Sequence, residues 1–184
     1  MPIPPFDGIL NVLPPHLGDP RNPADLSPYG CSVEDLCIQF ATSPARKQIL
    51  LGLLNLRAEL FGVGIRGFQW LGGSFLEDIE MQEGRPPNDV DAVTFADEPG
   101  SLVDFGEIIA ARRDLVFPQS KLSYAADHYL VSLASTPIRI VESTKYWYGL
   151  FSHRRDKLWK GMLLVDLRDK ANDDAARIAL ESKP

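Results

Sequence analysis

The sequence predicts an α/β or α+β fold in which helices flank a mixed sheet, and three observations predict it. The 184 residues are enough for one ordinary domain with a core. Apolar residues make up 45% and charged residues 24%, which is typical of a globular protein. After a helical section over 32–63, strand and helix patterns alternate over 67–168. We therefore expect one domain over 1–184, beginning with a proline-rich segment over 1–31.

Local signals predict the first elements. The prolines of residues 1–31 exclude a regular helix or a central strand, so this segment should be extended or turning, either packed over the domain or partly loose. A capping pattern at Ser32 predicts a short helix to about residue 40. Ser43, followed by a proline, opens a long amphipathic helix over about 44–61, which nearby glycines end.

Strands and helices interleave in the rest of the chain. The predicted strands cover about 68–71, 90–95, 123–132 and 162–167. The predicted helices cover a short stretch from Ser74, about 101–113, about 141–151 and the last dozen residues, with a polar loop over 80–88.

Charge and cysteine content limit the partners. The net charge of −6 argues against capture of duplex DNA, which requires a basic face, and leaves room for a small anion held through metal ions. Cys31 and Cys37 lack the surrounding ligands of a zinc site and should be reduced. No signal peptide and no apolar stretch near the roughly 20 residues that span a bilayer is found. We expect a soluble cytoplasmic protein with no membrane partner.

The stretch between the first two predicted strands of the core carries a phosphate-binding pattern. One strand ends at Gly72 and Gly73, and Ser74 opens the next element. Glycines let the backbone approach a phosphate closely, and a helix start offers unpaired N–H groups. We expect Ser74 to cap that helix and to donate its hydroxyl to a phosphate oxygen.

The next strand begins with paired carboxylates. Asp89 and Asp91 are two residues apart, so they share a face at about 6.6 Å along the backbone, while Val90 and Ala92 face the core. Such carboxylates can bridge two Mg²⁺ ions roughly 3.5–4 Å apart, shared with substrate phosphates. Asp127, on a strand long enough to lie beside this one, is the candidate third acid and would orient and deprotonate an attacking hydroxyl.

These motifs together resemble the signature of the polymerase-beta-like nucleotidyltransferases. The resemblance implies a nucleotidyltransferase-type mixed sheet and transfer of a nucleoside monophosphate from a triphosphate such as ATP to an acceptor hydroxyl, with release of pyrophosphate. The family pattern assigns Gly73 and Ser74 to phosphate and Asp127 to the third acid. It assigns Asp89 and Asp91 to both Mg²⁺ ions, with Mn²⁺ as an alternative metal.

A closer resemblance, to a small bacterial family, covers nearly the whole chain. Its members are known only as nucleotidyltransferase-like proteins of unknown role, so it supports the fold more than the substrate. The shared motifs are Pro4-Pro5-Phe6, a Leu-Pro-Pro, Gly73-Ser74-Phe75, Pro87-Asn88-Asp89-Val90-Asp91, the Asp127 strand, Tyr146-Trp147 and Lys160-Gly161.

The chain departs from the compact superfamily pattern at one point. Fourteen residues separate Ser74 from Asp89, and this insert is acidic. It is either a surface loop or a segment that moves the phosphate turn out of register with the aspartates. The acidic residues are Glu77, Asp78, Glu80 and Glu83.

Further residues have both a functional and a structural interpretation. Lys121 and Arg66 could reach phosphate, although each is also a candidate for a solvated face, and we keep Lys121 as a nucleotide-binding candidate. His128 should face away from Asp127 and belong to the core or the surface. The basic run 153–160 could hold a nucleotide or an RNA acceptor, with Trp159 available for stacking, or form a charged turn before a strand. An aromatic cluster in 146–151 is expected in the core or at an interface.

Three functions stay open. The first is a magnesium-dependent nucleotidyltransferase acting on a protein, an RNA end or a small molecule. The second is a catalytically weak or inert module, such as an antitoxin or a phage-defence partner, which the small size and the acidic insert favour and for which a protein partner or a homo-oligomer is expected. The third is a metal-dependent phosphohydrolase, which explains the glycine-serine turn less well.

Overall fold

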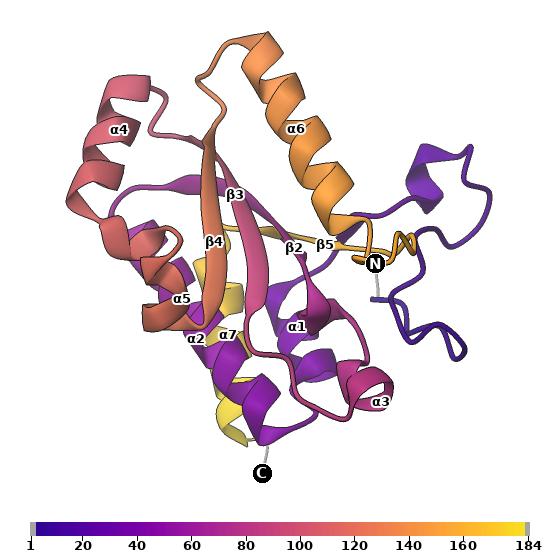
Figure 1. The fold of residues 1–184 in the computed structure, drawn as a ribbon. Coiled ribbons are helices and arrows are strands. Elements are labelled where there is room, and N and C mark those ends of the chain that lie inside the picture. Colours follow the sequence, from indigo (N-terminus) through magenta and orange to yellow (C-terminus); the bar gives the residue numbers. More distant parts are fainter. Residues whose placement is uncertain (1–2, 183–184) are drawn as a thin grey trace.

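Five strands form one mixed sheet in the order β1-β5-β2-β3-β4 (Figure 1). A computed structural model describes residues 3–182, so Pro2 of the proline-rich segment and the last two residues of the predicted final helix lie outside the described part. β2 runs antiparallel to β5 and β3, whereas β1 pairs with β5, and β3 with β4, in parallel. The strands are β1 (Tyr29–Gly30), β2 (Arg66–Gly72), β3 (Val90–Glu98), β4 (Ala126–Ser132) and β5 (Leu163–Asp166).

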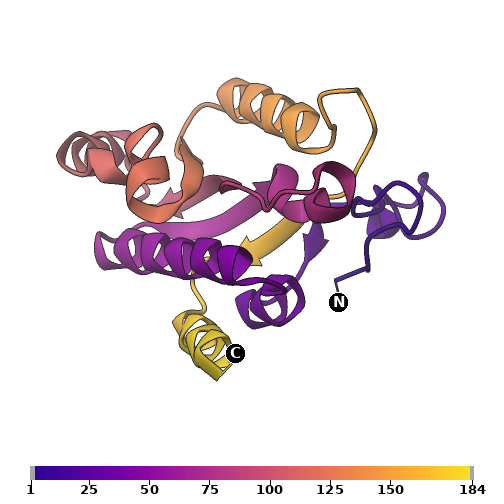
Figure 2. The same ribbon diagram turned by 60° about the horizontal axis from the view of Figure 1, so that its bottom comes forward.

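Helices cover both faces of this sheet, as predicted. In Figure 2, α1, α2 and α7 lie on one side of the strands and α6 lies on the other. The α-helices are α1 (Val33–Phe40), α2 (Pro44–Gly62), α3 (Ile79–Glu83), α4 (Leu102–Ala111), α5 (Gln119–Tyr124), α6 (Pro137–Phe151) and α7 (Lys170–Ser182). The 3-10 turns within residues 3–182 are η1 (Pro23–Asp25), η2 (Ser74–Leu76) and η3 (Arg113–Leu115). No helix in residues 3–182 has both the length and the apolar content needed to cross a membrane.

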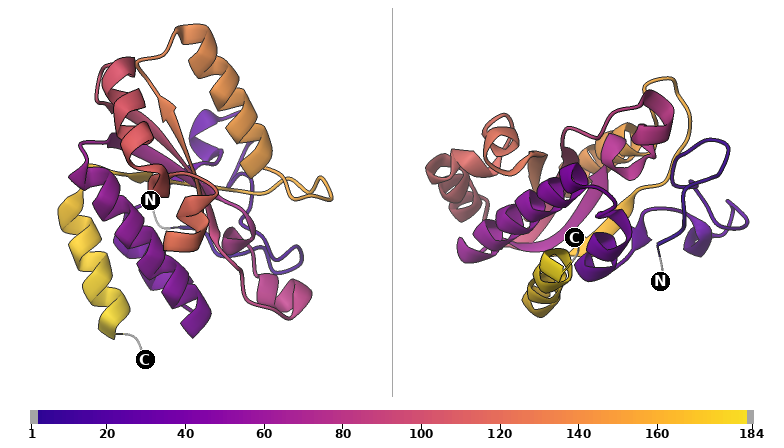
Figure 3. Two further views of the ribbon diagram at one scale, coloured as in Figure 1. Left: turned by 60° about the vertical axis from the view of Figure 1, so that its left-hand side comes forward. Right: turned by 90° about the horizontal axis from the view of Figure 1, so that it is seen from below.

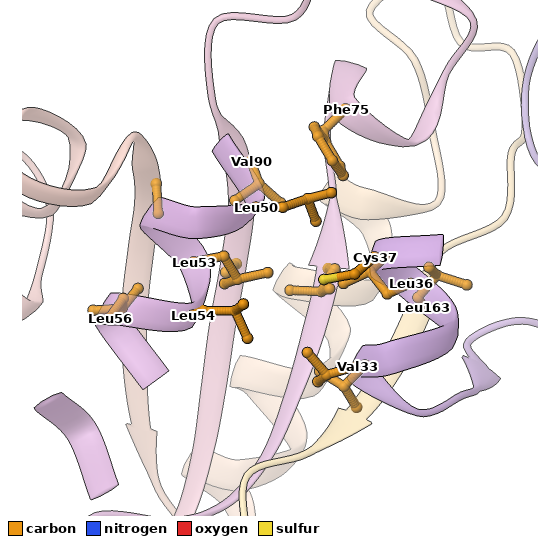
Figure 4. Packing of buried hydrophobic residues seen from close by; sticks show 14 of the residues in the cluster. Val33, Leu36, Cys37, Leu50, Leu53, Leu54, Leu56, Phe75, Val90 and Leu163 are labelled. Carbon is orange, nitrogen blue, oxygen red and sulfur yellow. The ribbon is translucent and has the colours of Figure 1, made fainter. Parts of the chain in front are cut away.

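The larger core lies under α1, α2 and α7. The apolar stripe of α2, including Leu50, Leu53 and Leu54, packs against Val90 and the neighbouring sheet residues (Figure 4). Burial of such side chains contributes about 1.5–3 kcal/mol each. α7 lies beside α2 (Figure 3), so the C-terminal helix completes the layer. Ser32 and Ser43 cap α1 and α2 as predicted, and Cys37 is buried in this core without a disulfide.

A second core lies between the sheet and α6. Val93 and Phe95 of β3 pack there with Trp147 and Phe151 of α6, which confirms the predicted burial of part of the aromatic cluster. Because successive strand residues alternate between faces, Asp91 shares the α6 face with Val93 and Phe95. The predicted aspartates therefore lie on the face of the sheet that α6 covers.

Several predicted bounds are wrong. The strand predicted over 123–132 begins at residue 126, because α5 continues to residue 124 and Ala125 takes a left-handed conformation that ends it. The predicted loop 80–88 contains most of α3, which Asp78 caps. The helix predicted from residue 141 begins four residues earlier, with Pro137 in its first turn.

A chain of hydrogen bonds crosses the sheet and fixes the side chain of His128. His128 Nδ1 contacts the carbonyl oxygen of Leu115, so Nδ1 carries the proton and Nε2 accepts from the hydroxyl of Thr94 at 2.7 Å. Thr94 accepts in turn from Gln69 Nε2 at 2.9 Å, and Gln69 Oε1 accepts from Arg57 at 2.7 Å. Every donor in this buried chain has an acceptor, so the neutral form of His128 is the form that the fold uses.

The buried position of His128 predicts a loss of stability in mild acid. Burial lowers the pKa of His128 from 6.5 to about 4. Because the folded-state pKa lies below the unfolded one, its stabilising effect is complete above pH 6.5 and is lost as the pH falls toward 4, up to about 3 kcal/mol. We expect urea unfolding at pH 7 and 4.5 to show this loss, and His128→Gln to be less stable at pH 7 but to lose less on acidification. Equal losses in the two proteins would contradict the assignment.

Candidate functional site

Three adjacent strands bring the predicted site residues together. Gly72 at the end of β2 pairs with Asp91 of β3, and Asp91 pairs with Asp127 of β4. Asp89 precedes β3 and lies two residues from Asp91 on the same face. The glycine turn, the Asp-x-Asp pair and Asp127 therefore meet at one end of these three strands, as predicted from the sequence.

The turn after β2 approaches Asp91 more closely than a side chain would permit. Gly73 has a φ of +74°, and a Cβ added there would lie 1.7 Å from Asp91 Oδ2. Only glycine fits both that backbone conformation and that space. The prediction that Ser74 caps a helix is wrong, because Ser74 is the first residue of a single 3-10 turn and Gly73 occupies the cap position without a side-chain bond. Within the part of the chain that the structure describes, the Ser74 hydroxyl makes no hydrogen bond.

Asp91 is the aspartate whose charge is least compensated. Burial, followed by the charges of Asp89 and Asp127, raises the pKa of Asp91 to about 6. Lys160 and Lys121 act in the opposite direction but do not offset these effects. A half-buried carboxylate close to two others is a common mark of a site that binds a cation or moves a proton.

Lys121 joins the other two aspartates. Its Nζ lies 2.5 Å from Asp89 Oδ2 and 3.1 Å from Asp127 Oδ2. The hydrogen bond to Asp89, before other effects, raises the pKa of Lys121. Lys121 thus belongs to the site and does not lie on an unrelated solvated face. Arg66, by contrast, stacks on the ring of Phe61 at 3.4 Å and donates to the backbone carbonyl oxygens of Phe61 and Ile65. It does not contact the three aspartates.

A buried ion pair contacts the backbone of the turn at Gly73. Lys160 and Glu77 have side chains that are 2% and 5% exposed and bond to each other. Lys160 Nζ also donates to the carbonyl oxygen of Gly73 at 2.7 Å. Burial lowers the pKa of Lys160. This lysine therefore fixes the backbone that faces Asp91.

The acidic insert does not move the turn out of register. Glu77 pairs with Lys160, Glu80 pairs with the buried guanidinium of Arg46, and Glu83 pairs with Arg85. Asp78 caps α3 through the N–H of Met81. Each of these acidic side chains thus has a partner, either in the insert itself or in a segment packed against it. The register of β2 and β3 is kept, because Gly72 still pairs with Asp91.

A cleft of about 950 Å³ opens over the three aspartates. Its far wall is the loop 153–158, which contains most of the predicted basic run. Arg154 pairs with Asp156 and Gln82, whereas Arg155 is exposed and has no ion-pair partner among residues 3–182. The ring of Trp159 packs against the ring of His16 in a tilted arrangement, with ring centroids 5.6 Å apart.

Two features of this cleft could not be predicted from the sequence. The proline-rich segment is packed over the domain, which is one of its two predicted arrangements, and Gly161 N donates to Leu13 O at 2.7 Å. Residues 9–11 of this segment also line the cleft, which was not predicted. No pattern within that segment indicated this role. No sequence pattern indicates the Lys160–Glu77 pair, although both residues lie in stretches with a recognisable motif, Lys160-Gly161 and the acidic insert.

The chemistry of the three aspartates fits Mg²⁺. Their ligands are carboxylate oxygens, which Mg²⁺ prefers. Asp127 Oδ1 is buried and has no hydrogen-bond partner within the described residues, so one lone-pair donor is available. Lys121 contacts one oxygen of Asp89 and one of Asp127, and no group of three or more His, Cys, Asp or Glu side chains in residues 3–182 is placed so that it could hold a metal ion.

Comparison with known proteins places the chain in a family without assigning a reaction. No curated protein and no solved structure matches the chain. The family described as "Family of unknown function (DUF6932)" matches residues 4–166. Because this match covers most of the sequence, the chain belongs to the DUF6932 family.

Proposed function

We propose that this protein transfers a nucleoside monophosphate from a nucleoside triphosphate to an acceptor hydroxyl and that it requires Mg²⁺. The observation that supports this most strongly is the alignment of Gly72, Asp91 and Asp127 on three neighbouring strands. A turn that only glycine can form then lies directly beside the half-buried carboxylate of Asp91. A simple structural turn would not require that proximity.

Each residue has a role in this proposal. Asp89, Asp91 and Asp127 would hold two Mg²⁺ ions or, alternatively, Mn²⁺; when bound, the ions neutralise charge on the transferring phosphate. The free hydroxyl of Ser74 would donate to a phosphate oxygen beside Gly73. Asp127 would orient the acceptor hydroxyl and accept its proton.

The cleft supports an acceptor on the side of the basic loop. Arg155 has no competing ion pair within the described residues, so it favours an acceptor that carries a phosphate, such as an RNA end. A protein side chain or a small molecule would reach the same aspartates through the open cleft.

Transfer of a labelled nucleotide tests this function. We expect the wild-type protein, with Mg²⁺, α-labelled triphosphates and cell extract, to label an acceptor and release pyrophosphate. Asp89→Asn/Asp91→Asn should reduce labelling on the order of a thousandfold. Asp97→Asn is a matched control, because Asp97 lies on the same strand but outside the cleft.

Other outcomes identify the alternatives. Absence of a labelled acceptor, or undiminished labelling by the double variant, would contradict transferase activity. Binding of a triphosphate without transfer would indicate the inert module, and release of free phosphate would indicate a phosphohydrolase.

A further inference from the structure

Lys121 holds two of the three aspartates in the way that a bound cation would. It contacts one oxygen of Asp89 and one of Asp127, and Asp91 is left without an ion pair among residues 3–182. The ammonium group therefore competes for the same oxygens that the proposed metal ions require. A metal ion that binds these carboxylates has to displace it.

The backbone of Lys121 is fixed, although its side chain is not. Ser120 Oγ donates to Ala126 O at 2.8 Å and accepts from His128 N at 3.2 Å, which ties α5 to β4. Gly52 lets α2 approach α5 so closely that an added Cβ would lie 2.1 Å from Tyr124 O. The Lys121 side chain is 44% exposed on a flexible stem. It can therefore leave the aspartates without movement of the helix that carries it.

Charge indicates where the released ammonium group would go. Two Mg²⁺ ions without nucleotide would give the site a surplus of positive charge next to Lys121. A fully ionised nucleoside triphosphate carries four negative charges, and two Mg²⁺ ions carry four positive charges. The net charge of the loaded site therefore equals that of the metal-free site. The triphosphate also supplies oxygen acceptors that replace the carboxylates of Asp89 and Asp127.

We propose that Lys121 is a displaceable counter-ion that couples metal binding to triphosphate binding. In the free protein it neutralises Asp89 and Asp127; in the loaded protein it turns from the carboxylates to the phosphates. This inference rests on the proposed function and adds to it a reason why metal and nucleotide bind together. The coupling is reciprocal, so the nucleotide must tighten metal binding as much as the metal tightens nucleotide binding.

Calorimetric titration with Mn²⁺ tests the coupling without measuring turnover. Wild type, Lys121→Met, Lys121→Arg and the control Lys145→Met are titrated with Mn²⁺, alone and with a non-hydrolysable ATP analogue. Lys145 carries the same charge but lies on α6 and does not line the cleft. We expect Lys121→Met to bind Mn²⁺ alone about tenfold more tightly than wild type, which is about 1.4 kcal/mol, and the tightening by the analogue to shrink by a similar factor.

The controls separate this inference from the proposed function. Lys121→Arg keeps the charge, so it should bind Mn²⁺ alone no more tightly than wild type does, and Lys145→Met should change neither affinity. If wild type binds Mn²⁺ and the analogue but Lys121→Met binds Mn²⁺ no more tightly, the inference is wrong and the metal-nucleotide site stands. If none of the proteins binds Mn²⁺ even with the analogue, both are wrong.

Discussion

Replacement of Lys160 by methionine is expected to lower the free energy of unfolding by about 3–5 kcal/mol. The Lys160 side chain is 2% exposed and bonds to Glu77, which is 5% exposed. Removal of the ammonium group leaves a buried carboxylate without a counter-charge, and this cost far exceeds that of losing a surface ion pair. Urea unfolding at pH 7 measures the loss, with Lys145→Met as the exposed control, for which we expect a change within about 0.5 kcal/mol.

The double variant Lys160→Met/Glu77→Met separates the stability of the pair from its role in the site. Because two apolar side chains can replace a buried ion pair at little cost, we expect it to be more stable than Lys160→Met alone. The carbonyl oxygen of Gly73 nevertheless loses the donor at 2.7 Å in both variants. We therefore expect triphosphate binding to stay weak in the double variant. Full recovery of binding would show that Lys160 serves stability alone.

The layers of the fold could be predicted because they depend on local patterns. The capping serine Ser43 and the apolar stripe that follows it define α2. Strand periodicity places Val90 and Ala92 in the core. The missed elements depend on tertiary contacts. α5 has no strong start signal, and it is held by the bonds of Ser120 to β4 and by its packing against Gly52. Propensity alone favoured a longer strand there.

The site could be predicted in its residues but not in its electrostatics. Spacing placed Asp89 and Asp91 on one face, and strand length placed Asp127 beside them, which the β3–β4 register confirms. No local pattern, however, indicates that Lys121 pairs with two of these carboxylates or that Lys160 reaches the turn from 87 residues away along the chain. Such contacts depend on how distant segments meet and follow only from the three-dimensional structure.

Replacement of Asp91 by asparagine is expected to stabilise the metal-free protein while it abolishes function. Burial and the charges of Asp89 and Asp127 raise the pKa of Asp91 from 3.8 to about 6. Because the pKa of Asp91 is higher in the folded than in the unfolded protein, the folded state binds the proton more tightly. This contribution to stability is complete below the unfolded-state pKa of 3.8 and is lost as the pH rises through 6. At pH 7.5 the charged form of Asp91 therefore costs up to about 3 kcal/mol, which asparagine avoids.

Chemical unfolding at pH 7.5 and pH 4, with and without Mg²⁺ and a triphosphate analogue, measures this effect. We expect Asp91→Asn to raise the free energy of unfolding by about 2–3 kcal/mol at pH 7.5 and by little at pH 4, where wild-type Asp91 is protonated in the folded state. Mg²⁺ with the analogue should stabilise wild type and not the variant, because ligands stabilise only a state that binds them. Asp97→Asn, which breaks an exposed pair with Arg168, should be neutral or slightly destabilising at both pH values. If Asp91→Asn is instead destabilised, Asp91 serves to hold the turn at Gly73. A residue that is kept for binding is expected to cost the fold stability through its charge.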